Sequence, residues 1–216
     1  MIITGAVFDL DGTLIDSMPM WHNFVGVYLD KYSMTPDDYL KANAKDMSFA
    51  QAAEYINEHY PLGKTKEEIE KDMEATAADA YANTIAIKHD VKPFLFALRC
   101  KGVRMCIATA SPREWAESAL KRLNIDHYFS VILSCYDLKT SKSDPMIYDR
   151  AFDILGTDRE TTYVFEDSVN CIRTAKAAGY KVIGVKDEMS APDEEEIKRL
   201  SDIYIKDFDD FRGMVR

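Results

Sequence analysis

Residues 3–13 organise the chain, and they read Ile3-Thr4-Gly5-Ala6-Val7-Phe8-Asp9-Leu10-Asp11-Gly12-Thr13. An apolar run that contains β-branched residues and ends on an acid predicts a buried strand from Ile3 to Asp9. A tight turn is predicted directly after it, because Gly12 permits backbone conformations that other residues avoid. The sequence therefore places two carboxylates, Asp9 and Asp11, at the end of a buried strand.

Downstream of this strand the pattern becomes helical and stays helical to about residue 84. Apolar residues recur at helical spacing from Trp21 to Leu29 and again from Ile69 to Tyr81. Between residues 17 and 90 no stretch has the alternation or the bounded apolar run that is typical of a strand. This part of the chain is predicted to be all-α.

After Asp90, predicted strands and helices alternate. Helices are predicted near 92–100, after Pro112, near 145–155, near 168–179 and after Pro192, and strands at 103–109, 131–133, 162–165, 181–185 and 202–205. This alternation is typical of βαβ units and a parallel sheet. The predicted fold is α/β, with a Rossmann-like, doubly wound parallel sheet formed by residues 1–15 and 90–216. An all-α helical-bundle cap domain is predicted as an insertion at residues 16–89.

Composition limits the classes of function. Thirty-seven acidic residues against 27 basic ones give a formal net charge of −10. Non-specific nucleic-acid binding needs a basic surface, so no nucleic-acid partner is expected. No segment resembles a signal peptide, and no run approaches the ~18 apolar residues of a membrane span, so no membrane partner is expected. The four cysteines form no CxxC pair and are expected to be buried thiols of a cytoplasmic protein.

Reactive polar groups gather where predicted strands end, which is where open α/β sheets bind their ligands. They are Asp9 and Asp11 after the first strand, Thr109 and Ser111 after the strand from 103, Lys142 in the loop 140–145, and Glu166 and Asp167 after the strand from 162. Two carboxylates ~4 Å apart repel by roughly 4 kcal/mol at an effective dielectric of about 20. A bound cation relieves this repulsion, and oxygen ligands favour Mg²⁺. The alternative, that these acids only cap helices and turns, does not explain why four such features occur together.

The sequence resembles the haloacid dehalogenase superfamily, in its phosphatase and β-phosphoglucomutase-like branch with a helical cap after the first strand. The motifs that carry the resemblance occur in the family's order and cover Val7 to about Val185. They are Asp9-Leu10-Asp11-Gly12-Thr13, Thr109, Lys142 and Glu166-Asp167-Ser168. The chain departs from the family at Ala110, where Asn is frequent, and at Ser143, where Pro is common.

The resemblance implies a role for each matching residue. Asp9 would be the nucleophile that forms an aspartyl-phosphate, and Asp11 the general acid and base. Thr109 and Lys142 would bind the transferring phosphoryl group, and Lys142 would also hold Asp9. Mg²⁺ would be bound by Asp9, by Asp167 and by the main-chain carbonyl of Asp11. Glu166 would bind the metal through water or orient one of its ligands.

Substrate contacts are expected from both parts of the chain. Thr109, Ser111 and Lys142 are the candidates in the α/β part, and Ser17 and Lys45 are the candidates near and within the cap. In related capped enzymes the position of Lys45 belongs to a loop that selects the substrate. The alternative for Lys45 is an ordinary surface lysine.

The function that the resemblance implies is a Mg²⁺-dependent phosphatase acting on a small phosphorylated metabolite, with a sugar phosphate as one candidate. The alternative is a β-phosphoglucomutase-like sugar-phosphate mutase. In that branch the cap loop carries a Lys and, four residues later, an Arg that binds the distal phosphate. This chain has Lys45 but Phe49 at the Arg position. The missing bidentate contact favours the phosphatase.

Overall fold

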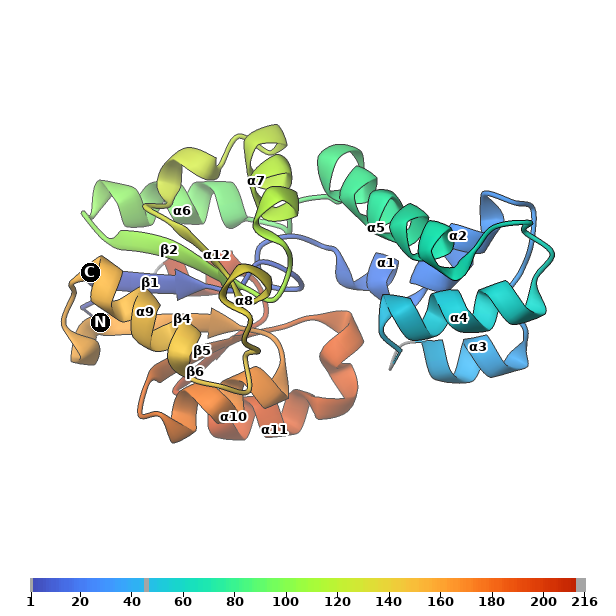
Figure 1. Ribbon diagram of the computed structural model, residues 1–216. Coiled ribbons are helices and arrows are strands. Elements are labelled where there is room, and N and C mark those ends of the chain that lie inside the picture. The colour runs from blue at the N-terminus through green and yellow to red at the C-terminus, as the bar shows by residue number, and fades with distance from the viewer. Residues whose placement is uncertain (1, 45–46, 213–216) are drawn as a thin grey trace. The chain divides into compact units, whose positions relative to one another are not determined.

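The computed structural model describes residues 2–44 and 47–212, and the chain forms two compact units (Figure 1). An α/β unit runs to Asp16 and resumes at Ile85, and a helical unit spans Ser17–Thr84. In the described residues no helix combines the length and the apolarity needed to cross a bilayer.

The α/β unit is built on a six-stranded parallel sheet with the order β3-β2-β1-β4-β5-β6. The strands are β1 (Gly5–Phe8), β2 (Arg104–Thr109), β3 (Ile132–Ser134), β4 (Thr162–Glu166), β5 (Lys181–Val185) and β6 (Ile203–Ile205). Every residue of β1 is buried, as expected of an interior strand covered on both faces. The predicted Rossmann-like, doubly wound parallel sheet is confirmed.

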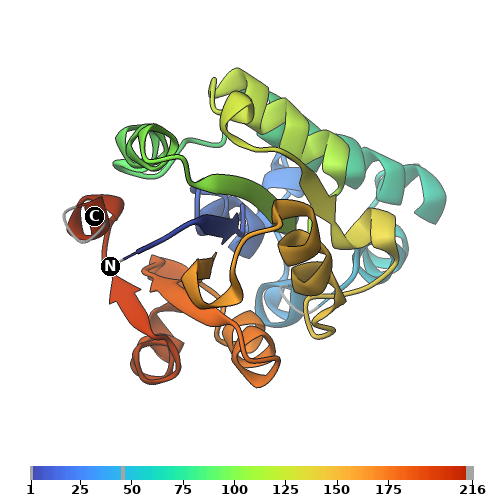
Figure 2. The same ribbon diagram turned by 90° about the vertical axis from the view of Figure 1, so that its left-hand side faces the viewer.

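Helices cover both faces of the sheet, as Figure 2 shows. The helices of this unit are α6 (Val91–Cys100), α7 (Arg113–Arg122), α8 (Cys135–Leu138), α9 (Met146–Leu155), α10 (Val169–Ala177), α11 (Glu194–Leu200) and α12 (Phe208–Arg212). Three short 3₁₀ helices lie between these elements, at Asp126–Tyr128, Arg159–Thr161 and Glu188–Asp193. The two short helices α8 and α12 were not predicted, because four or five residues are too few to establish a helical period.

Two apolar layers hold the sheet in place. On one face Val7 and Val164 belong to a buried cluster that includes Ile147 of α9 and Ile172 of α10. The other layer is aromatic: Phe8 of β1 and Phe165 of β4 stack with ring centroids 4.4 Å apart. The aromatic layer also contains Phe94 of α6 and Phe208 and Phe211 of α12. Packing on both faces fixes the central strands, and with them the residues at their carboxyl ends.

The helical unit contains α1 (Met18–His22), α2 (Phe24–Asp30), α3 (Asp38–Asn43), α4 (Phe49–His59) and α5 (Lys66–Asn83). Capping boxes start the two longest helices, at Ser48 with Gln51 and at Thr65 with Glu68. One face of α5 is buried at helical spacing, through Ile69, Met73, Ala77 and Tyr81. The all-α character predicted for this segment follows from these caps and this stripe.

The structure corrects two expectations. The division between the units lies at Asp16 and Ile85 instead of the expected 15/16 and 89/90, because residues 14–16 and 86–88 pair as short extended segments. The Asp16 N–H donates to the Ala86 carbonyl over 2.8 Å, and the Lys88 N–H donates to the Leu14 carbonyl over 3.0 Å. The second correction concerns the cysteines. Cys106 and Cys135 are buried, but Cys171 is half-buried and Cys100 is exposed; all four are free thiols.

Candidate active site

Adjacent parallel strands bring the predicted site residues of the α/β unit to one edge of the sheet. Asp9 directly follows β1, Thr109 ends β2, Glu166 ends β4 and Asp167 follows it. Because β1 pairs with both β2 and β4, these strand ends are neighbours. The Asp9 N–H also donates to the Phe165 carbonyl over 2.9 Å, which continues the β1–β4 ladder to the first acid.

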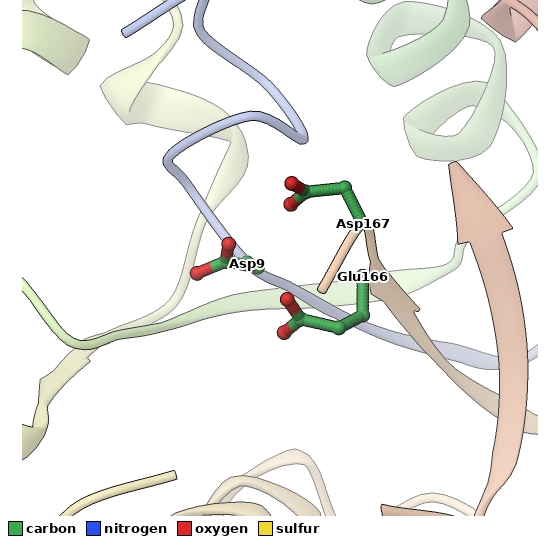
Figure 3. Close-up of side chains that lie close together, drawn as sticks. All are labelled: Asp9, Glu166 and Asp167. Carbon is green, nitrogen blue, oxygen red and sulfur yellow. The ribbon is translucent and has the colours of Figure 1, made fainter. Parts of the chain in front are cut away.

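Three buried carboxylates face the same space at this edge (Figure 3). Asp9, Glu166 and Asp167 each offer one oxygen, and these oxygens lie within 4.8 Å of one another. Figure 3 shows the side chains of Glu166 and Asp167 reaching toward the end of β1 that carries Asp9. Asp9 and Asp167 thus converge as the strand order predicts, and Glu166 is the third member of the group.

Lys142 bridges two of these carboxylates. Its Nζ donates to Oδ1 of Asp9 and, over 2.8 Å, to Oε2 of Glu166. The lysine side chain is 6% exposed and that of Glu166 1%. Glu166 Oε1 accepts the Ser168 N–H over 3.3 Å, so contacts are made by both oxygens of Glu166. This arrangement favours the second of the two predicted roles of Glu166, in which it orients Lys142 and through it Asp9.

Burial and mutual repulsion dominate the electrostatics of this cluster. Burial raises the pKa of Asp9 well above its usual value, and the neighbouring Glu166 raises it further, while Lys142 opposes both. Burial raises the pKa of Asp167 to about 8, again with Glu166 adding to the effect. For Lys142, burial alone would lower the pKa, but the carboxylates of Asp9 and Glu166 hold it well above its usual value.

A divalent cation fits this site. The single positive charge of Lys142 balances only one of the three buried carboxylates, and a cation would supply the remaining charge. Clustered carboxylate oxygens are the ligands that hard cations such as Mg²⁺ prefer. Asp9 and Asp167 are the side chains best suited to hold it, since Glu166 already contacts Lys142 and a main-chain N–H.

Asp11 has a different environment from Asp9. Its Oδ2 accepts a hydrogen bond from the Ser111 hydroxyl over 2.7 Å and a long one from the Thr109 hydroxyl over 3.5 Å. The Ser111 backbone is held in turn, because the Ser134 hydroxyl donates to its carbonyl over 2.7 Å. The two acids of the first motif therefore have separate partners, an ammonium for Asp9 and hydroxyls for Asp11, as different chemical roles require.

Thr13 is a site residue whose role is not predicted by the sequence motifs. Its hydroxyl donates to Oδ1 of Asp167 over 2.9 Å, and the side chain is fully buried. Gly12, which precedes it, has φ +78°, and a Cβ there would lie 2.4 Å from Oδ2 of Asp167. The Asp-Gly-Thr turn thus packs directly on the carboxylate of Asp167. The one indication in the sequence that Thr13 belongs to the site is its place in the Asp-Gly-Thr motif.

Ser17 and Lys45 are the two remaining candidates. Ser17 precedes α1 as its N-cap residue, and its side chain is fully buried within the described structure. Lys45 lies outside the described residues. Phe49, at the position where the mutase branch has Arg, packs in the helical unit with Phe24 and Trp21, at ring-centroid distances of 5.0 and 6.1 Å. These three rings line a pocket of about 330 Å³ within that unit.

Comparisons with known proteins find similarity over most of the chain. The family model of haloacid dehalogenase-like hydrolases matches residues 6–185. The hexitol phosphatase B of Escherichia coli is 27% identical over 190 residues, which cover 85% of this chain and 83% of that protein. The phosphorylated carbohydrates phosphatase of Thermotoga maritima is 24% identical over 177 residues, 82% of each chain. The fold matches the crystal structure of CbbY from Rhodobacter sphaeroides with a TM-score of 0.75 and 20% identity, over 98% of this chain and 96% of that one.

Proposed function

This chain belongs to the haloacid dehalogenase-like hydrolases and is a phosphatase of that family, and we propose that it is a Mg²⁺-dependent enzyme acting through an aspartyl-phosphate. The observation that carries the proposal is the contact of Lys142 with Asp9 inside a buried group of three carboxylates. Phosphoryl transfer depends mainly on alignment and on neutralisation of charge, and this cluster offers both.

Asp9 is the proposed nucleophile. One of its carboxylate oxygens attacks phosphorus, the bond from phosphorus to the substrate oxygen breaks, and Asp11 donates a proton to the leaving oxygen. Water then attacks phosphorus, Asp11 takes the proton back, and the Asp9 carboxylate leaves. Ser111 supports this role of Asp11, since its hydroxyl donates to Asp11 Oδ2 over 2.7 Å and so orients that carboxylate.

The neighbouring groups orient and neutralise. Lys142 fixes Asp9 Oδ1 and adds a positive charge beside the incoming phosphoryl group, and Glu166 fixes Lys142. Thr109 lies at the end of β2 with its hydroxyl next to Asp11, where it can donate its one proton to a phosphoryl oxygen in place of the long contact with Asp11. Mg²⁺, held by Asp9 and Asp167 with the main-chain oxygen of Asp11, would neutralise charge on the phosphoryl oxygens.

The proposed substrate is a small monophosphate of a sugar or polyol. Two relatives named for such activity, the hexitol phosphatase B and the phosphorylated carbohydrates phosphatase, match most of the chain. The mutase alternative lacks a supporting contact at residue 49, because Phe49 packs among aromatic rings and brings no cation. A mutase must hold a second phosphate, and a charge-assisted bidentate contact is the usual means.

A screen of sugar and polyol monophosphates for released phosphate tests the proposal, run with Mg²⁺ and with a chelator. We expect release that depends on Mg²⁺ and that is lost in Asp167→Asn. The matched control is Asp153→Asn, because Asp153 is an exposed acid on α9. Full activity in chelator would contradict the metal site. Conversion of glucose 1-phosphate to glucose 6-phosphate faster than phosphate release would replace the phosphatase with the mutase.

A further inference from the structure

Lys88 is a half-buried cation of the α/β unit that the proposed chemistry does not use. It lies between α5 and α6, in the extended segment that pairs with residues 14–16. Its side chain is 18% exposed, which is low for a lysine. The main chain at Lys88 is fixed as well, since its N–H donates to the Leu14 carbonyl over 3.0 Å.

The ammonium of Lys88 makes three hydrogen bonds, to acceptors on two different loops. Nζ donates to the Gly12 carbonyl over 2.6 Å, to the Lys186 carbonyl over 2.7 Å and to Asp187 Oδ2 over 3.0 Å. An ammonium has three protons, so each proton has an acceptor. Gly12 belongs to the turn after β1, and Lys186 and Asp187 follow β5. Lys88 therefore connects the turn after β1 to the loop after β5, and β4 lies between these two strands in the sheet.

The carbonyl that Lys88 holds belongs to the peptide between Gly12 and Thr13. Both residues of that peptide pack against Asp167. Gly12 leaves no room for a Cβ beside Oδ2, and the Thr13 hydroxyl donates to Oδ1. Rotation of the peptide would move the Thr13 hydroxyl away from Asp167 or press the backbone into it. The position of the Asp167 carboxylate thus depends on a peptide whose carbonyl is held by Lys88.

We propose that Lys88 is a positioning residue of the active site, which fixes the Gly12–Thr13 peptide and through it the carboxylate of Asp167. The inference rests on the proposed function, because Asp167 is there a ligand of Mg²⁺. Lys88 contacts neither the substrate nor the nucleophile in this role. Asp187 completes the arrangement: its Oδ2 accepts from Lys88 and its Oδ1 accepts the Met189 N–H over 2.9 Å, so its charge is paired and its position is fixed.

If Lys88 acted through its charge alone, its removal would change the affinity for Mg²⁺ in the opposite direction, so the proposal can be tested. Removal of a positive charge next to an acidic site should strengthen the binding of a cation, whereas loss of a positioning contact should weaken it. A substitution of Asp187 also distinguishes an effect of charge from an effect of position. Asp187→Asn removes a negative charge, which would weaken cation binding by charge, but it leaves Lys88 its two carbonyl acceptors, so positioning predicts little change.

The test is Mg²⁺ binding to the metal-free full chain, measured by titration calorimetry, with phosphate release measured in parallel. For Lys88→Met we expect the Mg²⁺ dissociation constant to rise about tenfold, the equivalent of about 1.4 kcal/mol. For Asp187→Asn we expect a change of less than about threefold, which is under about 1 kcal/mol. Lys92→Met is the control, because Lys92 is an exposed lysine on α6. We expect it to bind Mg²⁺ as the parent does.

Several outcomes would overturn the inference. Unchanged or tighter Mg²⁺ binding by folded Lys88→Met would show that the lysine is structural or acts by charge. If Lys88→Met does not fold, Lys88→Arg decides, because a planar guanidinium keeps the charge but cannot bring three donors of one nitrogen to these acceptors. Parent-like binding by Lys88→Arg would overturn the proposal. A parent chain that binds no Mg²⁺ would instead refute the proposed function, so the two failures are distinguishable.

Discussion

Replacement of Lys142 by Met removes the ammonium that joins Asp9 and Glu166 while keeping most of the aliphatic side chain. All three side chains are buried, at 6%, 8% and 1% exposure, so water replaces little of the lost contact. Removal of one partner from a buried ion pair costs about 3–5 kcal/mol. We expect the free energy of unfolding of the metal-free protein to fall by about that amount.

A second substitution separates this contact from general damage to the core. In Lys142→Met the Glu166 carboxylate is left beside Asp9 without its cation, so Glu166→Gln should cost less in that variant than in the parent. We expect a coupling free energy of about 1–3 kcal/mol from the double-mutant cycle. Lys92→Met, an exposed lysine on α6, is the control and should change stability by less than about 0.5 kcal/mol.

Equilibrium unfolding in urea with chelator measures the cycle. Trp21→Phe is used as the background, because the chain has 2 Trp and Trp115 on α7 then reports on the α/β unit alone. Circular dichroism recorded in parallel checks that the transitions coincide. The reasoning would be refuted by additive effects within about 0.5 kcal/mol. A Lys142→Met protein as stable as its parent would refute it too.

Three further predictions concern the same site. Gly12→Ala should lower the free energy of unfolding, measured in urea, by about 1–2 kcal/mol, because residue 12 has a left-handed backbone that disfavours a Cβ. The clash of that Cβ with Asp167 should add to the loss. Unchanged stability would contradict the packing described. Burial raises the pKa of Asp167 to about 8 in the metal-free protein. Between about pH 4 and about pH 8 the native state therefore holds a proton that the unfolded state has released. The free energy of unfolding should therefore fall as pH rises from about 4 to about 8, and Asp167→Asn should reduce that fall; an equal fall in both proteins argues against this origin. Ca²⁺ should support much less phosphate release than Mg²⁺, because it adopts larger and looser coordination; equal rates would contradict a site selective for Mg²⁺.

The sequence predicted the parts of the site that depend on strand order. Asp9 and Asp167 each follow an apolar strand, and parallel neighbours in a sheet end at the same edge, so their approach could be expected. The contacts of Lys88 could not be predicted from the sequence. Its acceptors are Gly12, Lys186 and Asp187, 76 to 99 residues away in the chain, and no local period or motif relates them. The hydrogen bond from Thr13 to Asp167 was missed for a related reason, because the motif fixes residue type but not the partner of a side chain.

The central claim is that Asp9 carries the phosphoryl group during turnover. The most direct measurement uses a substrate with a radiolabelled phosphoryl group, quenched in acid during steady-state turnover, followed by borohydride reduction and peptide mass spectrometry. Borohydride reduces an acyl phosphate to an alcohol and releases its phosphate. We therefore expect protein-bound label before the reduction and, after it, released label and a homoserine in place of Asp9. Both signals should be absent in Asp9→Asn. Label that remains bound in Asp9→Asn, or a homoserine at Asp11 or Asp167 instead, would contradict the account.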